Sequence, residues 1–250
     1  MPSCPSHSLP PPVRGASLAS HASSPQALRA AIPVDYLRCA VPTHMGGLGG
    51  GPEDLVPLMR SLCAQSLSAG VLFWCQRTAI EFLVQTFNVA LCEHLLPDLL
   101  SFQRAATAPL SLDAPALTAQ EGGRGLRLSG WVQSVANAQA DGVSLIVPVH
   151  MPASTPIPTP IPTPIPTPIP TPGFAGWAVL QSEEDGVHLE PGTLLPHLHN
   201  TCPARVRVDQ AFFRADEWLG DSPLLQQTEP VRLALGVLYQ SLIAAPETLL

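Results

Sequence analysis

The 250-residue chain carries 12 basic and 19 acidic residues, a net charge of −7, and 46% of its residues are hydrophobic. A chain of this size and composition can bury a sizeable core without disulfides, so we expect it to fold. All of its basic residues are arginines and none stand in a run, so the sequence lacks the positive footprint of a surface that binds nucleic acid.

The cysteines and the apolar windows indicate the compartment of the protein and whether it spans a membrane. The 6 cysteines form no C-x-x-C pair, and several lie in apolar stretches, as is typical of reduced, buried thiols and of a cytoplasmic protein. The most apolar window, residues 69–75, is followed at once by Gln76 and Arg77. It is far shorter than the roughly 20 residues of a membrane span. We therefore expect a soluble, cytoplasmic protein that contacts neither a membrane nor nucleic acid.

Residues 1–30 are rich in serine and proline and contain no acidic residue. They lack the apolar region of a secretory signal, whereas a cleaved organelle transit peptide fits their composition as an alternative. The sequence predicts a disordered tail here.

A helical pattern runs over residues 51–102. Pro52, followed by two acids, suits a helix start because proline loses no hydrogen bond there and carboxylates complement the helix dipole. The next segment, residues 68–87, has apolar residues at helical spacing and predicts a second, largely buried helix. Its Arg77 and Glu81 are four residues apart on one face. Together with Gln76 they could face an active site, but we favour a solvated or interhelical face because such charge pairs are common.

A third helix is predicted to begin at Asn88, a residue that caps helices well. Its apolar positions follow helical spacing: Cys92, Leu95, Leu96, Leu99 and Leu100. Pro97 is expected to kink or split this helix, although the apolar stripe continues across it.

From about residue 124 the apolar period changes to two. Leu126 and Leu128 alternate with Arg127 and Ser129, as in a half-buried strand. Further short apolar runs bounded by turn residues follow at 141–149, 176–182, 186–190 and 204–213. The pattern predicts an antiparallel β domain. After Asp221 the spacing becomes helical again.

A Thr-Pro-Ile-Pro repeat, residues 155–172, lies between two of these strands. Its prolines cannot donate to a sheet ladder, and each favours extended geometry in the residue before it. Loop-closure cost rises slowly with length, so we interpret the repeat as an insertion in a β-hairpin.

The order of these elements predicts an α+β fold. We expect an N-terminal helical domain, a middle antiparallel β-barrel or sandwich domain, and the start of a C-terminal helical bundle. The expected boundaries are a disordered tail at 1–30, the helical domain at 31–103, the β domain at 104–222 with its insertion at 155–172, and an incomplete helical segment at 223–250.

Four strings in this order resemble the acyl-CoA dehydrogenase family. They read "IPVDYLRCAVPTHMGGLGGGPEDL" (32–55), "LLPDLLS" (95–101), "GLRLSGWVQSVANAQADGVSLIV" (125–147) and "PARVRVDQAFFRADEWLG" (203–220). The resemblance covers roughly residues 32 to 240 and implies FAD as cofactor and α,β-dehydrogenation of an acyl thioester as activity.

The resemblance also implies where flavin contacts lie. The family's "TEP..GSD" segment corresponds to "ATAPLSLDAPAL" (106–117), and its "fiTNa" segment to residues 133–138. In the second segment the family's aromatic and hydroxyl residues are replaced by Ser134 and Ala136. The four expected cofactor-binding residues are Thr107, Ser111, Ser134 and Asn137.

No catalytic base is assigned. In the family the base is a glutamate of the C-terminal bundle, but Glu229 and Glu247 are the only glutamates after residue 222 and neither lies in a recognisable base motif. The resemblance implies an acyl-CoA substrate, and a homo- or hetero-oligomer through the apolar face of residues 231–244. The alternatives are a non-catalytic remnant that acts as a binding or assembly module, and a truncated gene product.

Two further motifs are similar to a metal site and to a phosphate loop, but each lacks a required part. His197 and His199 would share one face of a strand, but no third ligand with suitable spacing is near, so we expect no metal. The glycine-rich residues 45–51 lack the strand and the GK[ST] ending of a phosphate loop, and we expect a hinge before a helix.

Overall fold

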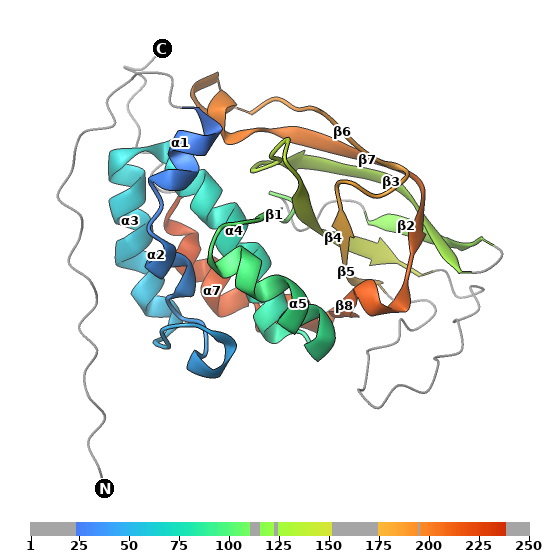
Figure 1. Cartoon of the computed structure of the whole chain (residues 1–250), viewed down its shortest axis with the longest axis horizontal. Coiled ribbons are helices and arrows are strands. Elements are labelled where there is room, and N and C mark those ends of the chain that lie inside the picture. The colour runs from blue at the N-terminus through green and yellow to red at the C-terminus, as the bar shows by residue number, and fades with distance from the viewer. Residues whose placement is uncertain (1–23, 111–115, 123–124, 152–174, 195, 239–250) are drawn as a thin grey trace, which may run out of the picture.

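The computed structural model describes residues 24–110, 116–122, 125–151, 175–194 and 196–238. The predicted α+β fold is confirmed: helices form one layer and a curved sheet forms the other (Figure 1). The helices are α1 (Pro25–Ala30), α2 (Val34–Arg38), α3 (Leu55–Gln65), α4 (Leu67–Gln85), α5 (Val89–Leu100), α6 (Pro223–Gln227) and α7 (Glu229–Leu235). Short 3-10 helices are η1 (Thr43–Met45), η2 (Pro52–Asp54), η3 (Pro196–Thr201) and η4 (Ala215–Glu217).

Helix α1 lies inside the stretch that the sequence predicts to be a disordered tail. Ser24 caps it by accepting a hydrogen bond from Ala27 N, and Pro25 occupies its first turn. Leu28 is buried in the core. Local capping together with one buried side chain explains why ordered structure begins before residue 31.

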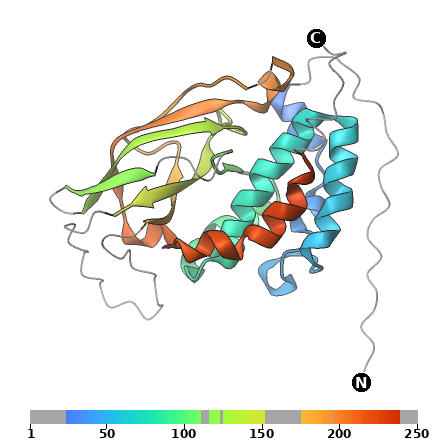
Figure 2. The ribbon, with the colours of Figure 1, turned by 180° about the vertical axis from the view of Figure 1, so that it is seen from behind.

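Helix α4 is the centre of the helical layer. It packs against α3, α5 and α7, and Figure 2 shows α7 lying along the helices on the rear face. The helix is long and apolar enough to qualify as a membrane span, but 83% of its most apolar window is buried inside the protein. A helix that is apolar nearly all round is typical of a protein core, and α4 has that place here.

The contact between α3 and α4 is closest at Gly70. A Cβ added to Gly70 would lie 2.6 Å from Cys63 Sγ. We expect Gly70→Ala to lower the free energy of unfolding by about 2 kcal/mol, since overpacking outweighs the better helix propensity of alanine. Denaturant unfolding measures this, and Cys63→Ala in the same chain should recover at least half of the loss. No recovery in the double variant would show that Cys63 is not the cause.

The Arg77–Glu81 pair is not solvated. Their side chains are 0% and 4% exposed, and Arg77 Nη1 lies 3.0 Å from Glu81 Oε2. Arg77 also donates to the carbonyl oxygens of Cys39 and Ala40, at 3.4 and 3.1 Å. The helix therefore holds the loop after α2 through a buried charge, which the i, i+4 spacing alone does not reveal.

Helix α5 continues through Pro97 without a break. Asn88 caps it as predicted, with its Oδ1 accepting a hydrogen bond from Leu91 N at 3.2 Å. The continuous stripe of buried leucines holds the helix together where proline removes one backbone bond.

The sheet has 8 strands in the order β6-β7-β3-β2-β4-β5-β8, with β1 paired to β4 outside this path. The strands are β1 (Ala105–Thr107), β2 (Leu117–Glu121), β3 (Leu126–Val135), β4 (Val143–His150), β5 (Ala175–Gln181), β6 (Val187–Pro191), β7 (Ala204–Phe213) and β8 (Trp218–Asp221). The sequence predicts antiparallel pairing throughout, but β1 and β2 both pair parallel with β4. Alternation is more typical of antiparallel sheets, but the polarity of each pair depends on how distant segments meet, which the period-two pattern does not fix.

Strands β4 and β5 pair directly, from Ser144↔Gln181 to His150↔Ala175. The Thr-Pro-Ile-Pro repeat lies outside the described residues, so its interpretation as a hairpin insertion stays a prediction. The pairing nevertheless shows that the strands on either side of it are antiparallel neighbours.

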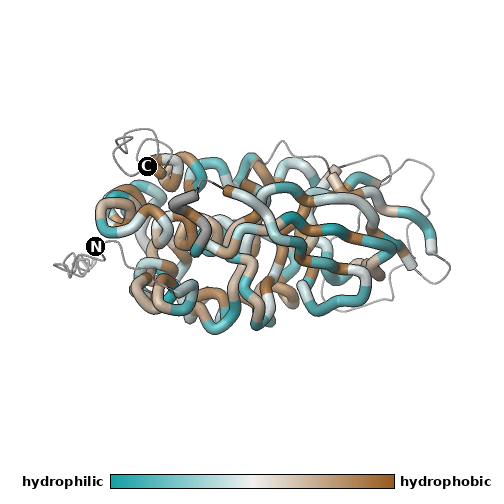
Figure 3. Tube along the Cα trace, turned by 90° about the horizontal axis from the view of Figure 1, so that it is seen from above, coloured by the Kyte–Doolittle hydropathy of each residue, from teal (hydrophilic) through white to brown (hydrophobic). Residues whose placement is uncertain are grey.

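Two apolar clusters make up the interior. One joins the helices to the near face of the sheet through residues such as Ile146, Trp177 and Val179, and the other lies within the curved sheet. Figure 3 shows apolar residues along the facing sides of both layers. The helical layer is thus fixed to the sheet, and the line where they join positions the candidate site.

Candidate functional site

The two segments that the resemblance assigns to flavin lie side by side. Leu110 N, just after β1, donates to Ser134 O at 3.0 Å. Asn137 Nδ2, just after β3, donates to Ala106 O at 3.0 Å. Ser111 lies outside the described residues. The fold therefore brings together the segments that contain Thr107, Ser134 and Asn137.

Gln76 of α4 joins these segments to the helical layer. Its Oε1 accepts hydrogen bonds from Ala106 N at 2.7 Å and from Asn137 Nδ2 at 3.0 Å. Its Nε2 donates to Leu99 O and Arg104 O, both at 3.0 Å. A buried amide that makes all four of its bonds fixes its partners strongly. We call this group the Gln76 clamp: Gln76, Leu99, Arg104, Ala106 and Asn137.

The side chains of Thr107 and Asn137 point into the interior. Both residues are fully buried. Asn137 Oδ1 accepts from Gln139 Nε2 at 3.1 Å, so both polar atoms of its amide have partners inside the protein. Thr107 Oγ1 donates to Ala108 O at 3.1 Å and is hydrogen-bonded to Cys75. Burial raises the pKa of the Cys75 thiol to about 12, so Cys75 is a neutral packing residue and not a nucleophile.

Ser134 differs from both, because it is exposed. Its φ of 54° places it in the left-handed region, which few residues other than glycine adopt. Ser134 is the next-to-last residue of β3 and lies at the register shift between Val132 and Val135, where the pairing with β7 is irregular. Of the predicted site residues that the structure describes, Ser134 is therefore the one that solvent or a ligand can reach.

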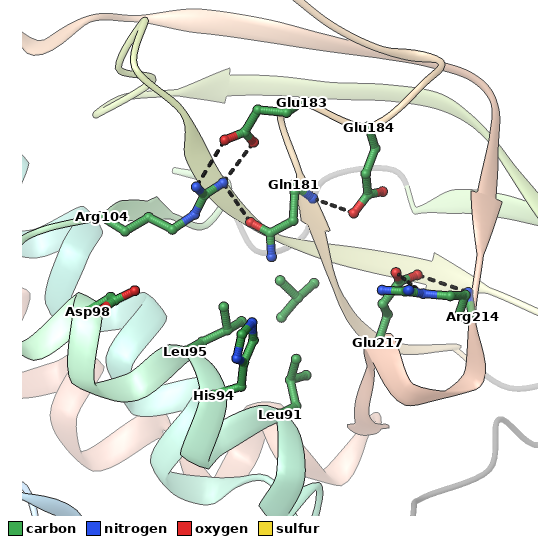
Figure 4. A pocket seen from close by; sticks show the side chains of 11 residues that line it. Leu91, His94, Leu95, Asp98, Arg104, Gln181, Glu183, Glu184, Arg214 and Glu217 are labelled. Carbon is green, nitrogen blue, oxygen red and sulfur yellow. Dashed lines mark hydrogen bonds and ion pairs between the residues drawn. The ribbon is translucent and has the colours of Figure 1, made fainter.

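A cavity of about 430 Å³ lies nearby, between α5 and the sheet. Figure 4 shows residues of α5 on one side and the turn after β5 on the other. Its lining is mixed, with apolar and charged side chains: Leu91, His94, Leu95, Asp98, Arg104, Val179, Gln181, Glu183, Glu184, Arg214 and Glu217.

Arg104 anchors the upper wall of this cavity. Its guanidinium forms two bonds to Glu183, at 2.9 and 2.7 Å, and others to Gln181 Oε1 and Ser144 Oγ, both at 2.8 Å. The hydrogen bonds from Arg104 lower the pKa of Glu183. Since Arg104 O also accepts from Gln76, the clamp and the cavity share this residue.

Two more carboxyl groups line the opposite side. Glu217 accepts from Arg214 Nε at 2.8 Å and from Arg214 N at 2.9 Å. Burial raises the pKa of Glu217, and it raises the pKa of Glu184 to about 7. Carboxyl groups of unequal acidity in one cavity are typical of sites that bind or exchange protons.

Comparison with known proteins identifies the fold. No protein-family model and no curated protein matches the sequence. Among solved structures, a glutaryl-coenzyme A dehydrogenase in complex with glutaryl-CoA has a TM-score of 0.64 at 15% identity, over 86% of this chain. PigA with FAD and proline has a TM-score of 0.67 at 15% identity, over 88%. A chain of the ChsE4–ChsE5 complex from Mycobacterium tuberculosis has a TM-score of 0.61 at 19% identity, over 85% of this chain.

The chain has the acyl-CoA dehydrogenase-like fold. It spans about half of the matched chains, with 55%, 57% and 50% of their lengths covered, respectively. The expected order of helices, sheet and helix is therefore found within about half of the length of these matched chains.

The described residues fit FAD in one respect and not in another. Ser134 fits a flavin contact, because it is exposed where the two segments meet. The side chains of Thr107 and Asn137 instead make hydrogen bonds to other buried groups of this protein. Their assignment as direct flavin contacts stays a prediction. Their hydrogen bonds hold the two segments and the helical layer together.

Sequence reasoning missed Gln76 as the organising residue of the site. The available signal was a polar residue directly after the most apolar window, inside a helix predicted to be buried. Buried polar side chains are hydrogen-bonded, so that position alone implied partners. It could not say which ones, because Ala106 and Asn137 are 30 and 61 residues away.

The predicted absence of metal stays a prediction. His197 and His199 belong to the 3-10 helix η3 and not to a strand, so the shared-face argument does not apply to them. The part of the chain that the structure describes contains no group of three or more His, Cys, Asp or Glu side chains that could hold a metal ion.

Proposed function

We propose that this chain supplies the helical and β parts of an acyl-CoA-dehydrogenase-type flavoprotein oxidoreductase that acts on an acyl thioester. The observation that carries the proposal is the meeting of the two flavin-assigned segments, through Leu110 N···Ser134 O and Asn137 Nδ2···Ala106 O. FAD, when bound, supplies the hydride acceptor. Ser134 would contact it, and the Gln76 clamp would keep the binding surface rigid.

The fold likeness supports the same proposal. PigA was solved with FAD and glutaryl-CoA dehydrogenase with glutaryl-CoA. We extend FAD binding and an acyl-CoA substrate to this chain on that basis. A cytoplasmic location belongs to the same proposal and rests on the sequence features alone. An oligomer through the C-terminal helix is also proposed and rests on the apolar face that the sequence pattern of residues 231–244 predicts.

A non-catalytic binding or assembly module is the second candidate. It is favoured by the internal bonds of Thr107 and Asn137, two of the positions at which the family's flavin contacts are expected. If flavin has no contacts there, the fold would persist as a scaffold without redox chemistry. Both candidates predict a stable folded chain, so only cofactor binding separates them.

Flavin retention is the deciding measurement. We expect the purified protein, incubated with excess FAD and passed through a gel-filtration column, to elute with the flavin absorbance on the protein peak. Protein that elutes colourless after such reconstitution would favour the module. A flavin-loaded protein that a panel of acyl-CoAs fails to bleach would keep the flavin proposal and remove the thioester substrate.

Ser134→Ala tests the assigned contact. Losing one hydrogen bond of about 0.5–1.5 kcal/mol should weaken FAD binding by about two- to twelvefold in a fluorescence titration. Ser222→Ala is the matched control, because Ser222 is exposed and its hydroxyl bonds only to Ala175 O among the described residues. Equal affinity in all three proteins would remove Ser134 from the flavin site.

A further inference from the structure

The cavity between α5 and the turn after β5 has the size and shape of a ligand site. Its volume of about 430 Å³ falls in the range of small-molecule pockets, which are mostly apolar with a few placed polar groups. Leu91, Leu95 and Val179 give it an apolar floor, and Figure 4 shows charged groups around that floor. Of the predicted flavin residues, the three that the structure describes do not line it.

Both guanidinium groups in the cavity are already neutralised. Arg104 pairs with Glu183 through two bonds, and Arg214 pairs with Glu217 through its side chain and main chain. An anionic ligand would have to displace a carboxylate from one of them. Charge-assisted pairs of this kind are the stronger hydrogen bonds of a protein, so the cavity does not suit an anion.

Asp98 and Glu184 are the lining carboxyl groups without an ion pair among the described residues; Asp98 is exposed, whereas Glu184 is half-buried. Its Oε1 accepts from Gln181 N at 2.9 Å. Its Oε2 is buried and has no hydrogen-bond partner among the described residues. A buried acceptor without a hydrogen-bond donor lowers the stability of the protein, and a ligand that donates a hydrogen bond to it would recover that loss. Figure 4 places this carboxyl group above the apolar floor.

We propose that this cavity binds a primary ammonium group on a short apolar stem. The ammonium, which offers three donors, would pair with Glu184 at its Oε2 after a side-chain rotation, and the stem would lie on Leu91, Leu95 and Val179. Free amines and the lysine side chain of another protein share this chemistry. The proposal concerns a site separate from Ser134 and does not rest on flavin binding.

The proposal predicts pH dependence with a definite sign. The Glu184 pKa of about 7 has desolvation as its main cause; Glu217 and Glu183 raise it further, while Arg214 lowers it. Only the ionised carboxylate pairs with a cation, so affinity should fall about tenfold from pH 8 to pH 6. Arg104 also lines the cavity, with His94 and Asp98 exposed on α5.

Calorimetric titration with pentylammonium at pH 8 and pH 6 tests the site, with 1-pentanol as a neutral ligand of the same shape. We expect pentanol to bind at least tenfold more weakly. Glu184→Gln should weaken pentylammonium binding about tenfold at pH 8 and remove most of the pH dependence, whereas His94→Gln should keep most of it. Equal binding of the two ligands, or an unchanged affinity in Glu184→Gln, would overturn the proposal.

The control variant is Glu190→Gln, which removes a carboxylate on β6 outside the cavity and should bind like the wild type. Glu184→Gln should stay folded, because burial disfavours the charge that it removes; circular dichroism checks this. A lysine peptide that binds more tightly than pentylammonium would identify a protein ligand. Weaker peptide binding would identify a free amine.

Discussion

Replacing Gln76 by alanine should cost about 4 kcal/mol of unfolding free energy. The change leaves Ala106 N–H and the Asn137 amide without their acceptor, and the carbonyl oxygens of Leu99 and Arg104 without their donor. Each buried orphan costs about 1–3 kcal/mol, reduced where a group keeps another partner or gains water. Urea unfolding followed by tryptophan fluorescence gives the loss, and faster exchange of the Ala106 amide proton would locate it.

Gln65→Ala is the matched control for this prediction. Gln65 also lies in a helix and donates two hydrogen bonds, but both go to Ser61 of the same helix and the residue is only half-buried. Its loss should stay below about 1 kcal/mol. If both glutamine variants lose the same small amount, the Gln76 clamp does not hold the site together.

Replacing Glu81 by leucine should cost about 3–5 kcal/mol, because it leaves the Arg77 guanidinium buried and unpaired. Burial already lowers the pKa of Arg77, and Glu81 opposes that shift. The double variant Arg77→Met/Glu81→Leu should be more stable than Glu81→Leu alone. Its recovery should be incomplete, since the carbonyl oxygens of Cys39 and Ala40 then lose their donor. Chemical unfolding of Arg77→Met, Glu81→Leu, the double variant and the wild type forms a double-mutant cycle.

The surface pair of Arg205 and Glu190 provides the comparison. Their side chains are 49% and 34% exposed, and their nearest N and O atoms are 3.2 Å apart. An exposed pair at a similar distance contributes about 0–1 kcal/mol, so Glu190→Leu should change stability little. A Glu81→Leu loss as small as this one would show that water reaches the Arg77 pair.

Elements with a strong local signal were predictable. Helix α5 begins after the cap at Asn88 as expected, and strands β3 to β7 lie where the period-two runs occur. The recognised strings carried the α+β order that the solved structures confirm. Helix α1 was missed because one cap and one buried leucine, Leu28, fix so short a helix.

The candidate site was predictable in its place and not in its side-chain directions. Residue strings pointed to the segments around Thr107 and Ser134, and these segments do meet. Whether a hydroxyl or an amide faces outward depends on its neighbours. Thr107 faces Cys75, and Asn137 faces Gln76; no local pattern contains either pair.

The sequence by itself determined the order of the main helices and strands, the cap at Asn88 and the two strands on either side of the repeat. These depend on propensities and periodicities that act over a few residues. Only the tertiary structure decided the parallel pairing of β1 and β2 with β4, the burial of Arg77 and Glu81, and the Gln76 clamp. The reason is physical: the clamp joins groups 23 to 61 residues apart, and hydrogen bonds between such groups exist only once the layers have packed.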